Sequence, residues 1–212
     1  MAKKFRELAL ATKGFMPQDE GDALYESASQ ACAKFPGLPI IEVGTYCGRS
    51  TVWLGAAAKH SKTVLFTVDH HSGSEENQKG WEWFDESLVD PKTQKLNTLP
   101  TFVETMRRAN LGSVVVPIVA ESQLASNQWS SSVAFCFIDG GHGALPAQRD
   151  FAGWSPKIIL GGYLAIHDVF SDPKDGGQAP YEFIYKVALN SGNFSEISST
   201  GSLRVLERTK ET

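Results

Sequence analysis

Ionisable residues follow the short apolar runs of this 212-residue sequence at recurring places. They stand at or just after the end of each run, and they are Glu42, Asp69, Glu121, Asp139 and the pair His167-Asp168. Carboxylates and imidazoles can accept hydrogen bonds from hydroxyl groups, bind divalent cations or move a proton. Because open α/β sheets bind ligands at the carboxyl ends of their strands, a row of such residues indicates a functional site.

A glycine-containing turn follows the first apolar run, with the sequence Glu42-Val43-Gly44-Thr45-Tyr46-Cys47-Gly48. Glycine after a strand lets the backbone approach a ligand closely, and the helix that begins near Ser50 presents free N–H groups. The dinucleotide fingerprint G-x-G-x-x-G is absent, since position 46 is tyrosine. Asp69, at the end of the next run, is placed to accept hydrogen bonds from both ribose hydroxyls of an adenosine cofactor. The alternative for Asp69 is a solvated aspartate at a strand end.

The elements that must position these residues are short apolar strands separated by helices. Strands are predicted over residues 38–43, 63–68, 114–119, 133–138 and 162–166, with a closing pair at 194–199 and 203–206. Helices are predicted over 18–34, 50–59, 101–109 and 144–154, the first within an N-terminal helical segment, 1–37. This order predicts one α/β domain over 1–212, with a Rossmann-like, doubly wound sheet that is mostly parallel and has an antiparallel C-terminal strand pair.

Taken together, these motifs resemble the class I S-adenosylmethionine-dependent methyltransferases. Residues 42–48 look like the glycine-rich cofactor loop of that family, and Asp69 matches its ribose-binding acid. Glu121-Ser122 falls where the family contacts the adenine. The resemblance covers nearly the whole chain. The cofactor-binding set that we expect comprises Glu42, Gly44, Thr45, Tyr46, Gly48, Ser50, Asp69, His70, Glu121, Ser122 and Asp139.

Two further motifs, Ile138-Asp139-Gly140-Gly141-His142 and Ile166-His167-Asp168-Val169-Phe170, resemble a subgroup of small-molecule O-methyltransferases. That subgroup includes enzymes that act on sugar hydroxyls, among them those for methylated mannose polysaccharides. By this resemblance Asp139, His167 and Asp168 would hold a divalent metal, and oxygen-rich ligands suit Mg²⁺ or Mn²⁺. Related metal-dependent enzymes often carry a carboxylate where this chain has His167.

An alcohol is a poor nucleophile until it loses its proton, so a methyl transfer to oxygen needs a base or a metal beside the hydroxyl. His142 is the candidate base, because an unperturbed imidazole titrates near pH 6.5. The alternative is a structural histidine that caps the helix beginning near Ala144. If His142 is not the base, His70, His71 and Glu75 are the next candidates.

The long irregular stretch, residues 70–97, begins directly after the proposed ribose acid and mixes amides, carboxylates and indoles. A segment of this length in a compact domain is usually functional. The residues that we expect to contact an acceptor, a sugar or another small polyol, are Tyr46, His71, Glu75, Asn77 and Trp81. The alternatives are a lid over the domain and a contact with a second subunit in a homodimer.

Composition excludes several other classes of protein. The net charge of −4 argues against a nucleic-acid partner, and no apolar run is long enough to span a membrane. The N-terminus lacks a signal-peptide pattern, so a cytoplasmic protein is expected. The three scattered cysteines predict buried reduced thiols. Two other functions stay open: a nicotinamide-dependent oxidoreductase, which the glycine spacing disfavours, and a non-catalytic cofactor-binding module.

Overall fold

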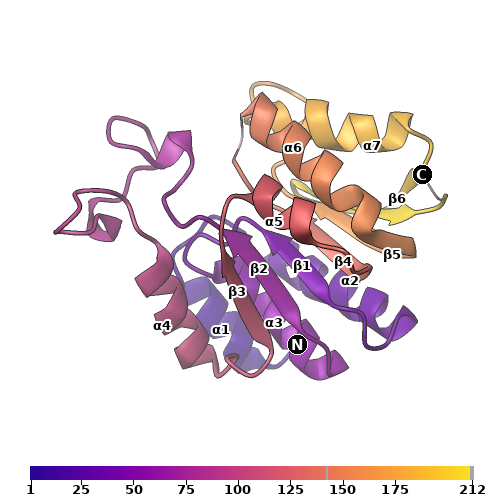
Figure 1. Ribbon diagram of the computed structural model, residues 1–212, viewed down its shortest axis with the longest axis horizontal. Coiled ribbons are helices and arrows are strands. Elements are labelled where there is room, and N and C mark those ends of the chain that lie inside the picture. Colours follow the sequence, from indigo (N-terminus) through magenta and orange to yellow (C-terminus); the bar gives the residue numbers. More distant parts are fainter. Residues whose placement is uncertain (142, 211–212) are drawn as a thin grey trace.

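A seven-stranded sheet forms the centre of the protein, in the strand order β3-β2-β1-β4-β5-β7-β6 (Figure 1). The structure is a computed structural model, and it describes residues 1–141 and 143–210. The strands are β1 (Ile40–Val43), β2 (Leu65–Asp69), β3 (Val115–Val119), β4 (Val133–Ile138), β5 (Ile158–Ile166), β6 (Phe194–Thr200) and β7 (Leu203–Arg208). Strands β1 to β5 pair in parallel, whereas β7 pairs antiparallel with both β5 and β6. The predicted doubly wound sheet with an antiparallel C-terminal strand pair is therefore confirmed.

Helices cover both faces of this sheet. The helices are α1 (Lys3–Ala11), α2 (Gln18–Lys34), α3 (Arg49–Ser61), α4 (Leu99–Ala109), α5 (Ser122–Gln128), α6 (Ala144–Trp154) and α7 (Lys186–Asn190). Helices α1 to α4 contribute to the core on one face, and α5 to α7 contribute to the core on the other (Figure 1). None of the helices in the described part of the chain is long and apolar enough to cross a membrane.

The two cores follow from the alternation of side chains along each strand. In β4, Phe135 and Phe137 pack into the core with α1 to α4, whereas Cys136 and Ile138 pack into the opposite core. Successive side chains of a strand point to opposite faces, so a strand buried on both faces must be apolar at every position. All six residues of β4 are buried accordingly. The three cysteines are also buried and free, as predicted.

Several details differ from the prediction. Strand β5 begins at Ile158 rather than at residue 162. Its pairing with β4 shifts register partway along, and Gly161, with a φ of 81°, allows the backbone to continue through that irregularity. Helix α5 and the π-helical turn Tyr181–Tyr185 before α7 were not predicted. The sequence of α5, SQLASNQ, has no apolar periodicity that would indicate a helix.

The 70–97 stretch is irregular, as predicted. Two short 3₁₀ turns, Glu75–Asn77 and Glu86–Leu88, and an isolated bridge between Val89 and Leu96 are its regular elements. This segment projects from the carboxyl ends of the parallel strands (Figure 1). It is therefore positioned beside the row of acidic residues.

Candidate active site

A cavity of about 1230 Å³ opens at the carboxyl ends of the parallel strands. Its lining includes Gly44 and Thr45 after β1, Asp69 at the end of β2, Asp139 after β4 and His167 after β5. Pockets for small molecules usually measure roughly 300–1,000 Å³. This cavity is therefore large enough for a nucleoside-sized cofactor together with a second small molecule.

The turn after β1 is fixed by the carboxylate of Asp69. Its Oδ2 accepts hydrogen bonds from the backbone N–H groups of Thr45 and Tyr46 at 2.8 and 2.9 Å. Its Oδ1 accepts the backbone N–H of His71 at 2.7 Å. One carboxylate thus connects the turn after β1 to the start of the 70–97 stretch, a role that the sequence did not indicate. The Thr45 hydroxyl also donates to Oδ2 at 3.3 Å, so Oδ2 is fully used. Each carboxylate oxygen has about two lone pairs, so Oδ1, with one backbone donor, can still accept a ligand hydroxyl.

Gly44 allows the turn to pass directly over the end of β4. Its φ is 83°, and a Cβ added at this position would lie 2.1 Å from the backbone oxygen of Asp139. No side chain fits in that space, so the glycine is required by close backbone approach. This contact brings the turn after β1 and Asp139 together.

Glu42 is fully buried and lies beneath the cavity rather than in its lining. Its two oxygens accept hydrogen bonds from the hydroxyls of Ser50, at 2.6 Å, and Thr51, at 2.7 Å. Burial raises the pKa of Glu42 to about 8, against the opposing effect of these hydrogen bonds. Glu42 therefore anchors the first turn of α3 through the hydroxyls of Ser50 and Thr51.

Three non-glycine residues at this end of the sheet have left-handed backbone conformations. They are Tyr46, His71 and Asp168, with φ values of 48°, 57° and 54°. Such conformations are uncommon for side chains with a Cβ, and they tend to occur at functional sites where the surrounding structure holds them in place. The hydrogen bonds from Tyr46 and His71 to Asp69 supply that restraint for two of them.

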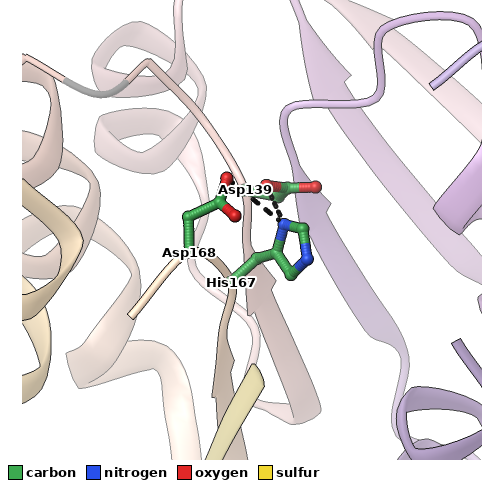
Figure 2. Close-up of side chains that lie close together, drawn as sticks. All are labelled: Asp139, His167 and Asp168. Carbon is green, nitrogen blue, oxygen red and sulfur yellow. Dashed lines mark hydrogen bonds and ion pairs between the residues drawn. The ribbon is translucent and has the colours of Figure 1, made fainter. Parts of the chain in front are cut away.

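Asp139, His167 and Asp168 form a compact cluster between the ends of β4 and β5 (Figure 2). One ligand atom from each residue lies within 4.8 Å of the others. The Nδ1 atom of His167 lies 3.0 Å from Oδ1 of Asp139 and 3.5 Å from Oδ2 of Asp168. Two carboxylates and one imidazole at such separations are a donor set that can hold a divalent cation.

His167 is buried among carboxylates on both sides of its ring. Its Nε2 atom lies 2.6 Å from Oε2 of Glu20, a buried residue of α2. Burial alone would lower the pKa of His167, but the negative charges and hydrogen bonds of Asp139, Asp168 and Glu20 outweigh it and raise the pKa well above its usual value. For Glu20 the effects have the opposite signs. Burial alone would raise the pKa of Glu20, but hydrogen bonds from His167 and Ser202 outweigh burial and lower that pKa below its usual value.

Most of the residues predicted to bind ligands line the cavity, and some do not. The lining includes Gly44, Thr45, Tyr46, Ser50, Asp69, His70, Glu75, Asn77, Glu121, Ser122, Asp139, His167 and Asp168. Glu42, Gly48, His71 and Trp81 lie outside the lining. The predicted base, His142, falls outside the described residues.

Three of the residues outside the lining, His71, Gly48 and Trp81, have different surroundings. The His71 ring is buried, with Nδ1 2.8 Å from the Thr98 hydroxyl, and it also contacts the backbone of Tyr46. Burial lowers the pKa of His71 below its usual value. Gly48, with a φ of 93°, packs against α4. Trp81 is 55% exposed.

Sequence reasoning missed an aromatic wall at the mouth of the cavity. The ring of Phe15, between α1 and α2, lies 5.6 Å from that of Tyr46 and 5.1 Å from that of Trp83. Lys13 and Asp85 form an ion pair beside these rings, so the segment before α2 is tied to the 70–97 stretch. The only signal in the sequence was an aromatic residue in a short linker, which does not reveal its neighbours.

Asp150 of α6 is a second residue that the sequence did not indicate. It lies in the cavity lining, beneath Gly140, where a Cβ would be 2.6 Å from its Oδ2. Burial raises the pKa of Asp150 to about 6, although a hydrogen bond from Ser122 opposes the shift. The Ser122 hydroxyl also accepts a hydrogen bond from the Trp154 indole at 2.9 Å. Asp150 therefore supports the turn after β4 from below.

Comparison with known proteins places this arrangement in a family. A family model described as a methyltransferase domain matches residues 41–169, more than half of the chain. The O-methyltransferase NovP is similar over 90% of this chain and 79% of that chain, with 14% identity and a TM-score of 0.67. The O-methyltransferase TomG from Streptomyces achromogenes, involved in tomaymycin synthesis and solved with SAM, is similar over 99% and 91%, with 14% identity and a TM-score of 0.62. An O-methyltransferase from Bacillus cereus, solved with SAH, is similar over 98% and 92%, with 16% identity and a TM-score of 0.64.

The sheet order, the antiparallel C-terminal strands and the cavity at the strand ends define the class I methyltransferase fold. Within that class, the chain belongs to the methyltransferase domain family whose model spans 41–169. The alternative of a nicotinamide-dependent oxidoreductase is thereby removed. The expectation of a methyltransferase domain, drawn from the glycine turn and the strand-end acids, is confirmed.

Proposed function

We propose that the protein transfers a methyl group from S-adenosylmethionine to a hydroxyl of a sugar or another small polyol, assisted by a divalent metal. The observation that carries this proposal is the cluster of Asp139, His167 and Asp168 in the same cavity as the glycine turn. A methyltransferase needs a cofactor site and a means of activating its acceptor side by side. The O-methyltransferases of similar fold support the choice of oxygen as the acceptor atom.

The cofactor would bind against the turn after β1. Gly44, Thr45 and Tyr46 present backbone there, Asp69 would accept a ribose hydroxyl, and Glu121-Ser122 would face the adenine. When bound, S-adenosylmethionine supplies an electrophilic methyl group and its own leaving group, so the protein has to orient and deprotonate the acceptor. Glu42 and Gly48 would act on the cofactor only through the shape of the turn.

The metal would be held by one carboxylate oxygen each from Asp139 and Asp168 and by Nδ1 of His167. The fit rests on the donor chemistry: two hard oxygen ligands and one imidazole suit Mn²⁺ and are compatible with Mg²⁺. Such a cation lowers the pKa of a nearby hydroxyl by its charge. His142 stays the predicted base that removes the proton.

The acceptor would enter between the aromatic wall and the metal ligands. Phe15 and Trp83 are 55% and 48% exposed, although both belong to the cavity lining. Such rings pack against the apolar C–H face of a sugar ring, while carboxylates such as Glu75 accept its hydroxyl hydrogens. The lining holds nine carboxyl groups against three lysine and arginine side chains, which favours an uncharged acceptor over an anionic one.

The test is a methyl-transfer screen with radiolabelled S-adenosylmethionine over neutral sugars, polyols, phenols and sugar phosphates, with Mg²⁺ or Mn²⁺ and with chelator. We expect transfer to neutral hydroxylated rings, loss of activity in chelator and recovery with metal. Asp139→Ala and Asp168→Ala should reproduce the loss, and Asp172→Asn, an exposed residue after β5, is the matched control.

Three outcomes would contradict parts of the proposal. Full activity in chelator, with no metal found by elemental analysis, would contradict the metal. Transfer restricted to phenols would contradict the sugar or polyol acceptor. Binding of S-adenosylhomocysteine without transfer to any acceptor class would favour the non-catalytic module. A cytoplasmic location and a homodimer stay predictions.

A further inference from the structure

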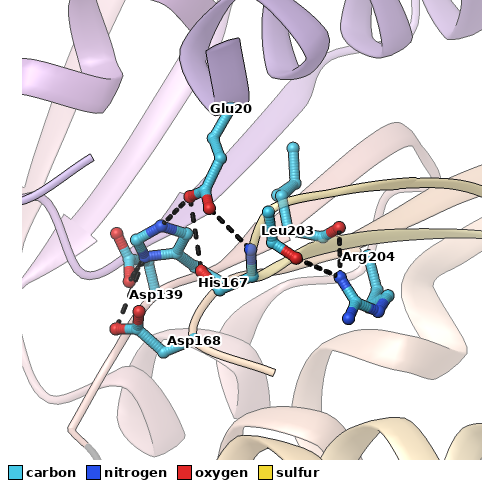
Figure 3. Close-up of polar contacts among 8 residues, drawn as sticks. Glu20, Asp139, His167, Asp168, Leu203 and Arg204 are labelled. Atoms are coloured by element: carbon cyan, nitrogen blue, oxygen red, sulfur yellow. Dashed lines mark hydrogen bonds and ion pairs between the residues drawn. The ribbon is translucent and has the colours of Figure 1, made fainter. Parts of the chain in front are cut away.

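Glu20 reaches the metal-binding cluster from a distant part of the chain (Figure 3). It stands in the first turn of α2, it is 4% exposed, and its Oε2 atom lies 2.6 Å from Nε2 of His167. The opposite ring nitrogen of His167 faces Asp139 and Asp168. The imidazole is thus held between one carboxylate on its far side and two on the side of the cavity.

The Glu20 side chain is itself fixed by the turn between β6 and β7. Its Oε1 atom accepts the backbone N–H of Ser202 at 2.6 Å, and Oε2 accepts the Ser202 hydroxyl at 3.3 Å. Gly201, with a φ of 54°, leaves room for it, since a Cβ there would lie 2.1 Å from Oε1. The carboxylate therefore has one defined orientation toward His167.

The position of the proton on an imidazole is set by the hydrogen bond that its other nitrogen makes. An ionised carboxylate can only accept, so Glu20 requires a proton on Nε2 of His167. The other nitrogen, Nδ1, donates to Asp139 when no cation is bound. A cation bound between Nδ1 and the carboxylates of Asp139 and Asp168 would replace that proton, and Nδ1 would then offer it a lone pair. Histidines that bind metals commonly donate their second N–H to a carboxylate in this way.

We propose that Glu20 is a positioning residue, which orients His167 and holds its proton on Nε2 so that Nδ1 can act as the third metal ligand. This inference rests on the metal site of the proposed function. Glu20 and Ser202 both lie outside the segment 41–169 that the family model matches. The N-terminal helix pair and the C-terminal strand pair thereby contribute to the metal site without lining it with ligands.

The test measures binding of Mn²⁺ alone to the full chain by electron paramagnetic resonance, for the wild type, Glu20→Gln and Asp19→Asn. Glutamine keeps the shape of Glu20 but can accept on one oxygen only, so it cannot satisfy both His167 and Ser202 as acceptor. We expect Glu20→Gln to weaken Mn²⁺ binding by about 10- to 100-fold. Asp19→Asn removes the same charge from an exposed neighbour on the same helix and should bind Mn²⁺ as the wild type does. S-adenosylhomocysteine affinity should be equal in all three proteins.

A second measurement keeps the inference testable if Glu20→Gln does not fold. In wild-type protein loaded with Zn²⁺, ¹⁵N-resolved histidine spectra should show the His167 proton on Nε2. A proton on Nδ1, or a folded Glu20→Gln variant that binds Mn²⁺ within about twofold of the wild type, would overturn the inference. Failure of the proposed function looks different: Mn²⁺ binding would follow the expected pattern, but no acceptor would be methylated. A wild type that binds no Mn²⁺ would overturn both the metal site and this inference, while transfer in chelator could still establish a methyltransferase.

Discussion

Replacing Glu42 with glutamine should make the protein more stable at alkaline pH. Glu42 is buried at the base of the cavity, and burial raises its pKa to about 8 from an ordinary value of 4.5. Between these two values the folded protein retains a proton that the unfolded chain releases. The contribution of Glu42 to the free energy of unfolding is therefore fully present below pH 4.5 and is lost as the pH rises to 8.

The size of this effect follows from the width of the pH window. Each unit of pKa difference corresponds to about 1.4 kcal/mol, so a shift from 4.5 to about 8 gives an upper limit of about 5 kcal/mol. Between pH 6 and pH 8 alone, the loss is about 2 kcal/mol, since the slope decreases near the folded-state pKa. Glutamine has no proton to lose in this range and can still bond to the Ser50 and Thr51 hydroxyls.

The assay is urea unfolding of the wild type and Glu42→Gln at several pH values from 6 to 9. The difference between the two proteins isolates Glu42, because His167, His71 and Asp150 titrate in both. We expect the free energy of unfolding of the wild type, relative to the variant, to fall by about 2 kcal/mol from pH 6 to pH 8 and then to level off. A difference that is constant with pH would refute the raised pKa and show that Glu42 is ionised in the folded protein.

Three further predictions concern the turn, the ribose acid and the base. Asp69→Ala should weaken S-adenosylhomocysteine binding by about 1.5 kcal/mol or more, because the ribose loses a hydrogen bond to a charged acceptor and the turn after β1 loses the carboxylate that fixes it; calorimetry showing unchanged affinity would remove Asp69 from the cofactor site. Gly44→Ala should lower the free energy of unfolding by about 2 kcal/mol or more, because the new Cβ would overlap the backbone of Asp139; a urea midpoint equal to that of the wild type would contradict this close approach. His142→Ala should reduce turnover by about 10²- to 10⁴-fold with cofactor affinity intact if His142 is the base; a lower melting temperature with full turnover would instead assign it to a helix cap.

The elements predicted best from the sequence are those whose pattern is local. Strand β4 and helices α2 and α6 have the predicted bounds, because a continuous apolar run bounded by polar residues, or an amphipathic repeat, depends on neighbours in sequence. The row of strand-end acids also followed from local signals. Parallel strands place their carboxyl ends on one rim, so the order of strands alone is enough to expect Asp69, Asp139 and His167 in one cavity.

Contacts between distant segments could not be predicted in this way. Glu20 looks in the sequence like an ordinary acid in the first turn of a helix, where the helix dipole stabilises a negative charge. No residue near it in the sequence indicates that His167 is its partner. The loop residues His71 and Trp81 were expected to face an acceptor. Sequence does not fix side-chain direction in irregular backbone, and His71 points into the core while Trp81 is exposed.

The contacts of Glu20 also have a consequence for the order in which the protein assembles. Glu20 is 147 residues from His167 and 182 residues from the backbone N–H of Ser202 that fixes it. Contacts of such long sequence separation form slowly, because chain closure must precede any gain from them. During synthesis the chain emerges from its N-terminus, so α2, β1 and the glycine turn are available well before β7 exists. The side of the cavity formed by the turn after β1 can therefore organise on the nascent chain. The side formed by His167 completes only after the final strand pair has docked.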